Sequence, residues 1–252
     1  MNKFLLAITA ITLLTLTACK KDEPLPPTPD PTPTEATIRM AFHWKSGLAD
    51  FNINNTYQDG AGNPVRFTFL KFYASDFHLT NDDGAQVAEF HNKVLLVDAA
   101  SSNNTFTLGT MPPGHVHEVH LVLGLDSATN HADPMQAPYP LDQPNMHWFW
   151  NPTAGYIFLK AEGYVDVNGN GSFDPGVDQG FEYHCATLAL RREKHMHMHM
   201  DAMAGQTHTL EAQVDVNMLL MGLDLLANPV GHGGGANAQA MMDNLVTAIS
   251  AH

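Results

Sequence analysis

Apolar and polar residues alternate along most of the chain after residue 36, which is the pattern of strands with one buried face. The first run contains Ile38, Met40 and Phe42, and a longer one extends from Val65 to Leu79. Clusters of Asn, Asp, Gly, Pro and Ser separate the runs, as turns do. Further strand-like runs cover residues 94–97, 106–108, 116–123, 156–165, 181–190 and 207–216. About eight short strands indicate an all-β fold, an antiparallel β-sandwich with long ordered loops.

Helical patterns are confined to the C-terminal part of the chain. Residues 217–226 predict a short helix, and apolar residues at helical spacing predict another over 238–249. Between them, Gly231 to Gly235 predicts a flexible break. The chain therefore divides into a β domain over 36–227 and a C-terminal segment, 228–252, made of this break and a helix.

The first 35 residues predict export. Residues 1–18 have a basic start, a short apolar run and small final residues, as signal peptides do. The ending Leu16-Thr17-Ala18-Cys19 resembles a bacterial lipobox, so we expect a lipid on Cys19. This lipid would anchor the protein in the outer membrane of a bacterial envelope, on its periplasmic or exposed side. Residues 19–35 are proline-rich and predict an extended linker.

Composition narrows the function. Lys and Arg total 12 against 26 Asp and Glu, a net charge of −14, which excludes binding to nucleic acid as a leading idea. Two cysteines cannot form a disulfide framework, and we expect Cys185 to be a buried, inert thiol. The unusual feature is 15 histidines beside 13 methionines, because both residue types bind transition metals.

The densest group of these residues is an alternating tract. It consists of His195, Met196, His197, Met198, His199 and Met200. On a strand the imidazoles would line one side and the thioethers the other. Imidazole suits Cu(II), Ni and Zn, whereas thioether sulfur selects Cu(I). We expect a hairpin end or exposed loop that captures copper weakly. The alternative is a low-complexity tract without function.

Other histidines are more dispersed. His115 and His117 would share one face of a strand and Glu118 with His120 the other, either as a secondary copper pair or as solvated side chains. Single histidines from different strands could also converge on one site. These are His43, His78, His131, His147 and His184.

A further motif has the spacing of a calcium loop. Its oxygen-bearing residues are Asp166, Asn168, Asn170, Ser172 and Asp174, with glycine at the sixth position. The twelfth position holds Val177 where an EF-hand has glutamate, and Asp178 follows. We expect a structural calcium ion here. The alternative is a plain Asn-Gly turn.

Several other motifs occur in an order that resembles one family. They are Phe72-Tyr73-Ala74-Ser75-Asp76-Phe77, Leu123-Gly124-Leu125-Asp126, Asn130-His131-Ala132-Asp133-Pro134, Met146-His147-Trp148-Phe149-Trp150, Gly155-Tyr156-Ile157-Phe158-Leu159-Lys160 and Phe181-Glu182-Tyr183-His184. The set resembles the MbnP-like family of copper-binding periplasmic or surface proteins, which includes the methanotroph proteins CorA and MopE. The resemblance spans about residues 37–218. Three features depart from it: His147, Cys185-Ala186 after the histidine, and the His-Met tract.

This resemblance implies an exported, β-rich copper binder, and we expect it to bind copper without turning over a substrate. In some relatives a tryptophan is oxidised to kynurenine, with a dihaem MauG-like enzyme as the partner; the candidates here are Trp44, Trp148 and Trp150. For the ordered copper site we choose His43, His131 and His184, and we expect affinity to fall below about pH 6 as histidines protonate. The competing hypothesis is a calcium-stabilised surface adhesin or glycan-binding module, with Trp148, Trp150 and Tyr156 as its sugar platform.

Overall fold

Strands dominate the computed structural model, which describes residues 33–149, 151 and 153–252. Pro33–His252 form one unit. The predicted signal peptide, lipidation at Cys19, most of the linker and Trp150 lie outside the described residues. Within the part that is described, no helix has the length and apolar character needed to cross a membrane.

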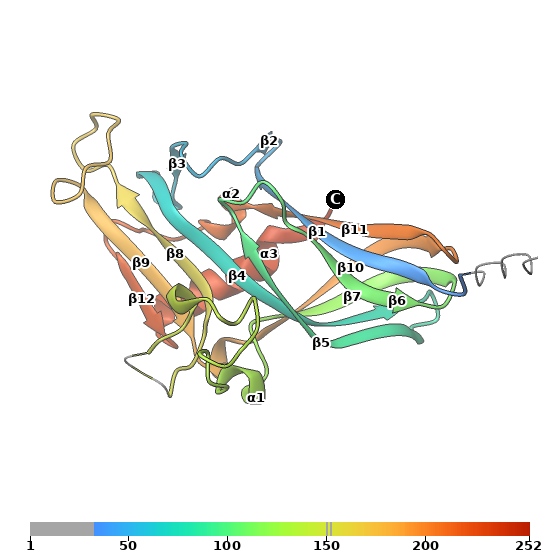
Figure 1. The fold of residues 1–252 in the computed structure, drawn as a ribbon. Coiled ribbons are helices and arrows are strands. Elements are labelled where there is room, and N and C mark those ends of the chain that lie inside the picture. The colour runs from blue at the N-terminus through green and yellow to red at the C-terminus, as the bar shows by residue number, and fades with distance from the viewer. Residues whose placement is uncertain (1–32, 150, 152) are drawn as a thin grey trace, which may run out of the picture. The chain divides into compact units, whose positions relative to one another are not determined.

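Two mixed β-sheets form the unit (Figure 1). The smaller sheet has the order β13-β11-β1-β2, with β6 also paired to β1. Its strands are β1 (Ala36–Ser46), β2 (Ala49–Asp50), β6 (Thr105–Met111), β11 (Thr207–Asp215) and β13 (Ile249–Ala251). β1 and β11 run parallel, whereas β6 and β2 are antiparallel to β1.

The larger sheet has the order β10-β7-β4-β8-β9-β12, with β3 and β5 also paired to β4. Its strands are β3 (Tyr57–Gln58), β4 (Pro64–Thr80), β5 (Gln86–Asp98), β7 (Gly114–Leu123), β8 (Ile157–Val165), β9 (Gln179–Ala186), β10 (Arg192–Ala202) and β12 (Val230–Gly233). The long strand β4 pairs with β8 through its first half and with β5 and β7 through its second half. It therefore divides this sheet into a β5-β7-β10 end and a β8-β9-β12 end.

The predicted β-rich fold is confirmed, with two differences in its connections. Most strand pairs are antiparallel as expected, but β1–β11 and β9–β12 are parallel. The expected flexible break at Gly231–Gly235 is wrong over most of its length, because Val230–Gly233 form β12 against β9. This pairing satisfies backbone groups that a loop would leave to solvent.

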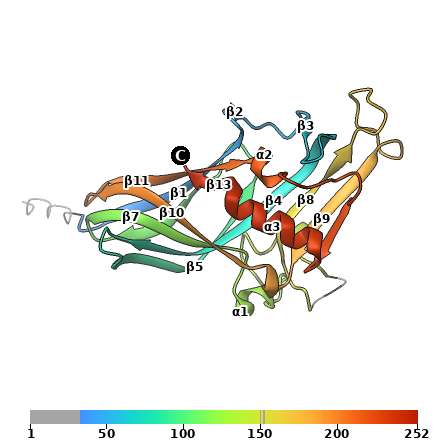
Figure 2. The ribbon, with the colours of Figure 1, turned by 180° about the vertical axis from the view of Figure 1, so that it is seen from behind.

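Three short α-helices complete the unit. They are α1 (Ser127–Asn130), α2 (Val216–Leu219) and α3 (Ala236–Ala248), with 3₁₀ turns η1 (Pro144–Met146) and η2 (Leu188–Leu190). The predicted C-terminal helix is confirmed as α3, which lies across the strands when the molecule is seen from behind (Figure 2). It buries Met241, Met242 and Leu245 in the main core.

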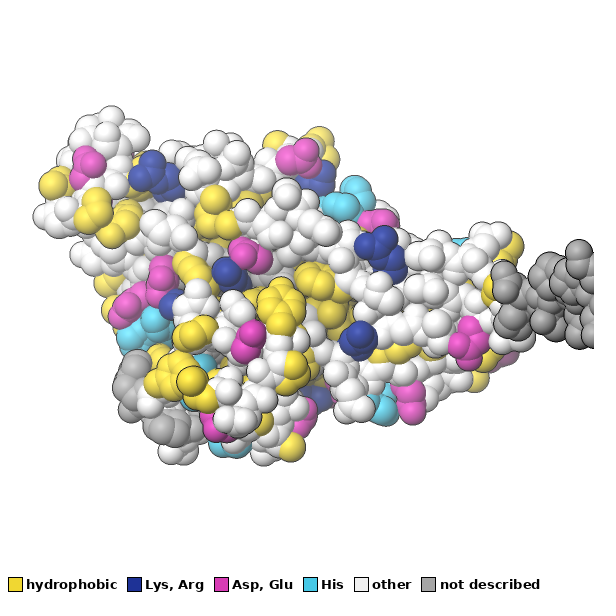
Figure 3. All heavy atoms as spheres, viewed as in Figure 1, with side chains coloured by type: hydrophobic (Ala, Val, Ile, Leu, Met, Phe, Trp, Pro, Cys, Tyr) yellow, Lys and Arg dark blue, Asp and Glu magenta, His cyan; other side chains and the backbone are white. Residues whose placement is uncertain are grey.

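The period-two pattern in the sequence corresponds to the buried side of each sheet. In β1, Ile38 and Met40 are fully buried, and they join residues of β4 such as Phe72 in one large core. A second, small cluster contains Trp148, Ala154, Ile157 and Ala186 beside β8 and β9. Histidine side chains appear on the outer surface in separate patches (Figure 3). The polar faces of the strands are therefore where metal-ligating groups can gather.

Candidate metal centres

The His-Met tract forms the middle of strand β10, where we expected a hairpin end or loop. Its side chains alternate, so His195, His197 and His199 are exposed. Met196 and Met198 are only 3% and 7% exposed and belong to the main core. The separation of imidazoles from thioethers is thus as expected for a strand. The two methionines predicted as copper ligands instead pack in the core. Burial of a largely apolar thioether side chain lowers the free energy of the folded protein.

Strand β7 brings further imidazoles to the same outer face. It pairs antiparallel with β10, with His120 opposite His195 and Glu118 opposite His197. The pairing shifts register between His197 and Met200. Such an irregularity re-aims side chains next to it.

This irregularity corrects one expectation about β7. His115 and His117 do share a face, but the expected placement of Glu118 and His120 on the opposite face is wrong. Val116 and Val119 are both fully buried, so the two residues between them turn outward together. We call the resulting surface the histidine face. It comprises His78, His91, His115, His117, His120, His195, His197 and His199, from β4, β5, β7 and β10.

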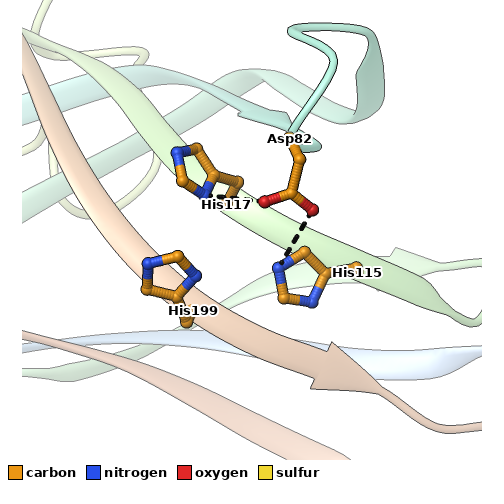
Figure 4. A group of neighbouring side chains, drawn as sticks. All are labelled: Asp82, His115, His117 and His199. Atoms are coloured by element: carbon orange, nitrogen blue, oxygen red, sulfur yellow. Dashed lines mark ion pairs between the residues drawn. The ribbon is translucent and has the colours of Figure 1, made fainter.

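One group on the histidine face combines three imidazoles with a carboxylate (Figure 4). It consists of Asp82, His115, His117 and His199, and one ligand atom from each lies within 4.8 Å of the others. Asp82 belongs to the turn between β4 and β5, and its two oxygens lie 3.1 Å from Nδ1 of His117 and 3.5 Å from Nε2 of His115. The rings of His199 and His117 have centroids 4.7 Å apart.

Two neighbouring groups lie further along the same face. Glu118, His120 and His195 form one, in which the two rings are 3.9 Å apart. Asp76, His78 and His91 form the other. Asp76 has a left-handed backbone (φ 54°) and accepts hydrogen bonds from both rings, at 3.1 Å from His78 and 2.7 Å from His91.

These two groups share a hollow of about 170 Å³. Its lining includes Asp76, His78, His120 and His195. The side chains of Arg191 and Glu193 also line it. Metal-ligating groups therefore continue across neighbouring strands instead of ending with the β10 tract.

A separate group lies at the other end of the larger sheet, and we call it the Trp148 site. It comprises Trp148, Glu162, Glu182, His184 and His232. β12 runs parallel to β9 and places His232 opposite His184, so that their rings stack with centroids 5.0 Å apart. Trp148 meets both rings edge-on, at 6.3 Å from His184 and 5.7 Å from His232.

Carboxylates orient the imidazoles of the Trp148 site. Nε2 of His184 donates to Oε1 of Glu162 at 2.6 Å, and this hydrogen bond holds the pKa of Glu162 below its ordinary value. Nδ1 of His184 is buried and has no hydrogen-bond partner. Nε2 of His232 lies 3.0 Å from Oε1 of Glu182 without the geometry of a hydrogen bond. A buried ring nitrogen without a partner costs free energy unless an ion or a water binds it.

The histidines chosen for the ordered copper site do not come together. His43 lies on β1 beside Glu211 (2.5 Å) and the ring of His252, in the smaller sheet. His131 caps α1 and donates to the carbonyl of Ser127 at 2.8 Å. No potential metal group found among the described residues contains more than one of the three chosen histidines. Of the three, only His184 belongs to such a group of the described residues.

The tryptophan candidates also separate. Trp44 turns to the core, where its ring neighbours are Phe51 and Phe72, and adjacent His43 faces outward. Trp148 lies against two imidazoles and is 5% exposed. Tyr156 is fully buried as well. The described residues of the expected sugar platform therefore offer almost no exposed surface to a sugar.

The predicted calcium loop is held by its own backbone. Asp166 accepts from the amides of Gly169 and Gly171 at 2.7 and 2.9 Å, and these hydrogen bonds lower its pKa. Asp178 accepts from the amides of Val167 and Asp174. Calcium binding at this loop stays a prediction.

Cys185 is fully buried, as expected. Burial raises the pKa of its thiol, so the sulfur stays protonated and unreactive at neutral pH. Its Sγ lies 3.5 Å from the carbonyl oxygen of Ala238 in α3. The thiol therefore belongs to the packing of α3 on β9 and not to the group around His184.

Sequence reasoning missed Asp82, Glu162 and His232 as neighbours of the candidate histidines. The Gly-Gly-Gly that follows His232 favoured a loop, yet the Val-Gly-His before it is compatible with a short strand. Asp82 stands in the run Asn81-Asp82-Asp83-Gly84, whose residue types predict only a turn. No local spacing connects either residue with its neighbours in space, because 48 positions separate His184 from His232 and 33 separate Asp82 from His115.

A two-sheet β fold with imidazole groups on its outer surfaces defines the class as a β-rich protein with potential metal sites. The MbnP family profile matches residues 35–241. The chain therefore belongs to the MbnP family. A solved structure, MbnP from Methylosinus trichosporium, is similar with a TM-score of 0.56 and 17% identity, covering 80% of this chain and 82% of that one. No curated protein matches the chain.

Proposed function

We propose that this protein is an exported copper-binding protein that holds copper at the Trp148 site and does not turn over a substrate. Membership of the MbnP family, a family of copper-binding partner proteins, supports copper as the metal. The observation that carries the location is the pair of stacked imidazoles, His184 and His232, with an unpaired buried nitrogen on His184.

The donor set suits copper. Neutral imidazole is a good ligand for copper and zinc, and copper binds more tightly than zinc at a given site. Glu162 fixes Nε2 of His184, which leaves Nδ1 as the free donor. A carboxylate that orients a histidine in this way also raises its basicity toward a metal. The buried ring of Trp148 limits access of water and slows loss of the ion.

We propose Trp148 as the residue that would be converted to kynurenine if this chain is modified as in its relatives. It is the described tryptophan with imidazole rings beside it, and Trp150 lies outside the described residues. A dihaem MauG-like enzyme would be the modifying partner. Intact mass of protein from its own host, with a digest that locates any shift on Trp148, tests this step; an unchanged mass refutes it.

Lipidation of Cys19 would hold this copper protein on a bacterial outer membrane. The lipobox-like sequence at residues 16–19 supports this proposal. Metabolic labelling with a fatty acid should mark the wild-type chain and leave Cys19→Ser unlabelled. Equal labelling of both chains would refute the anchor.

Equilibrium dialysis against Cu(II) above pH 7 tests the copper proposal. The wild-type protein should retain tightly bound copper, and His184→Ala/His232→Ala should lose that fraction. The matched control is His131→Ala/His208→Ala, which removes two imidazoles that lie outside every potential metal group of the described residues. Equal loss in both variants, or full retention in the first, would overturn the location of the site.

A further inference from the structure

We infer that Asp82, His115, His117 and His199 form a second metal site, for a divalent ion of the Cu(II) and Zn(II) class, which fastens the β4–β5 turn to β7 and β10. This inference does not depend on copper at the Trp148 site, because the two groups share no residue. It also differs from loose capture by a flexible tract, because the ligands stand on paired strands.

The donors converge from three separate segments. The carboxylate of Asp82 points down from the β4–β5 turn toward the rings, while two rings rise from β7 and the third from β10 (Figure 4). One ligand atom from each residue lies within 4.8 Å of the others. Four such donors match the number and kinds of ligand that zinc takes in closed sites, where imidazole and carboxylate are both common.

Neighbouring contacts orient individual donors. Nδ1 of His115 donates to Oδ1 of Asp201 at 2.7 Å, which leaves Nε2 directed to Asp82. A histidine whose second nitrogen donates to a carboxylate is the usual arrangement around a protein-bound metal. Nδ1 of His117 is buried and lies 3.1 Å from Asp82 without forming a hydrogen bond. An ion between ring and carboxylate would satisfy this nitrogen.

The site favours a divalent ion over Cu(I). Its donors are nitrogen and oxygen, which suit borderline and harder ions. The soft donors that flank His199, Met198 and Met200, pack with the core on the other side of β10. Alternation on the strand therefore excludes the sulfur atoms from the site that their neighbours build.

Binding at this site would join a turn to a sheet. Asp82 lies in the Asn81–Ala85 turn, where backbone hydrogen bonds close the loop. Turns of this kind open locally more easily than the strands that they connect. An ion that bridges Asp82 with two strands would reduce this opening. A variant that cannot bind the ion would show no such reduction.

Zinc titration of the full-length protein, followed by calorimetry and by hydrogen exchange of the β4–β5 turn, tests the inference. Zn²⁺ should slow exchange in residues 81–85 of the wild type. His117→Ala/His199→Ala should lose one zinc equivalent together with this protection. The control His131→Ala/His208→Ala and the variant His184→Ala/His232→Ala should both keep the turn protection. The copper dialysis of His184→Ala/His232→Ala tests the Trp148 site separately, because this variant should lose copper and still show zinc-dependent protection of the turn.

Two milder variants keep the test decisive if the double variant is poorly folded. Asp201→Asn removes only the orienting carboxylate and should weaken zinc binding about 10- to 100-fold, the usual range for such partners. Met196→Leu/Met198→Leu should leave zinc binding unchanged. Unaltered affinity in Asp201→Asn together with zinc-independent exchange of the turn would overturn the inference, as would loss of zinc in the methionine variant.

Discussion

The histidine face and the Trp148 site are built from the same ligands at opposite ends of one sheet. Both use imidazoles from neighbouring strands and nearby carboxylates, and β4 passes between them. They differ in enclosure. His195, His197 and His199 are exposed, whereas the side chain of His184 is only 12% exposed and lies beside the buried indole of Trp148.

This difference separates exchange of an ion from its retention. At an exposed site, water competes with the ligands for the ion and protons compete with the ion for the ligand nitrogens. Ions therefore enter and leave readily. At an enclosed site, the unbound donors pay for their burial, and binding an ion removes that cost. We therefore expect the histidine face to exchange divalent ions and the Trp148 site to retain copper.

The largest expected effect comes from Trp148→Ala. Removing a buried tryptophan typically costs about 3–5 kcal/mol of the free energy of unfolding. Trp44→Ala is the matched control, because Trp44 is equally buried but packs against Phe51 and Phe72. Chemical denaturation should show similar losses for both, while copper retention should fall only in Trp148→Ala. Equal copper loss in both variants would remove the distinction between the two tryptophans.

A smaller effect is expected from Gly231→Ala. An added Cβ would lie 2.5 Å from the ring of Tyr183, so β12 must shift away from β9. Overpacking of this kind costs about 1–3 kcal/mol. Because His232 is the next residue, its ring would move from His184, and dialysis should detect weaker copper retention. Zinc-dependent protection of the β4–β5 turn should be unchanged; a parallel loss there would mean that the two sites are coupled.

Cys185 should show almost no reaction in the native protein. Burial raises the pKa of its thiol, so at pH 8 the reactive thiolate is nearly absent. Mass spectrometry after iodoacetamide treatment should find Cys185 unmodified until denaturant is added. Rapid native alkylation that copper suppresses would make the sulfur a ligand and contradict a nitrogen-and-oxygen donor set.

Calcium removal should have the smallest effect. The carboxylates of Asp166 and Asp178 accept hydrogen bonds from amides of their own loop, and neither belongs to a potential metal group of the described residues. Exhaustive dialysis into calcium-free buffer should therefore leave copper retention unchanged. Loss of copper that calcium restores would connect this loop to the Trp148 site and favour the calcium-dependent hypothesis.

The fold was largely predictable because strand alternation is local. The sides of β10 could be assigned from the order His195-Met196 alone, and α3 from its apolar spacing. The ligand sets could not be assigned, because they depend on strand order and register. Parallel pairing of β12 with β9 brings His232 to His184, and a register shift turns His117 and Glu118 to one face. The proximity of His43 to Trp44 in the sequence wrongly suggested that the two side chains lie together. Adjacent residues of a strand face opposite sides of the sheet.

Elemental analysis of the protein purified from its own host envelope tests the central claim most directly. The account predicts copper in the wild-type protein at close to one equivalent that survives dialysis. It predicts that this copper is missing from His184→Ala/His232→Ala and present in His117→Ala/His199→Ala. Copper that is absent from the wild type, or that disappears only with the histidine-face variant, would contradict the assignment of retained copper to the Trp148 site.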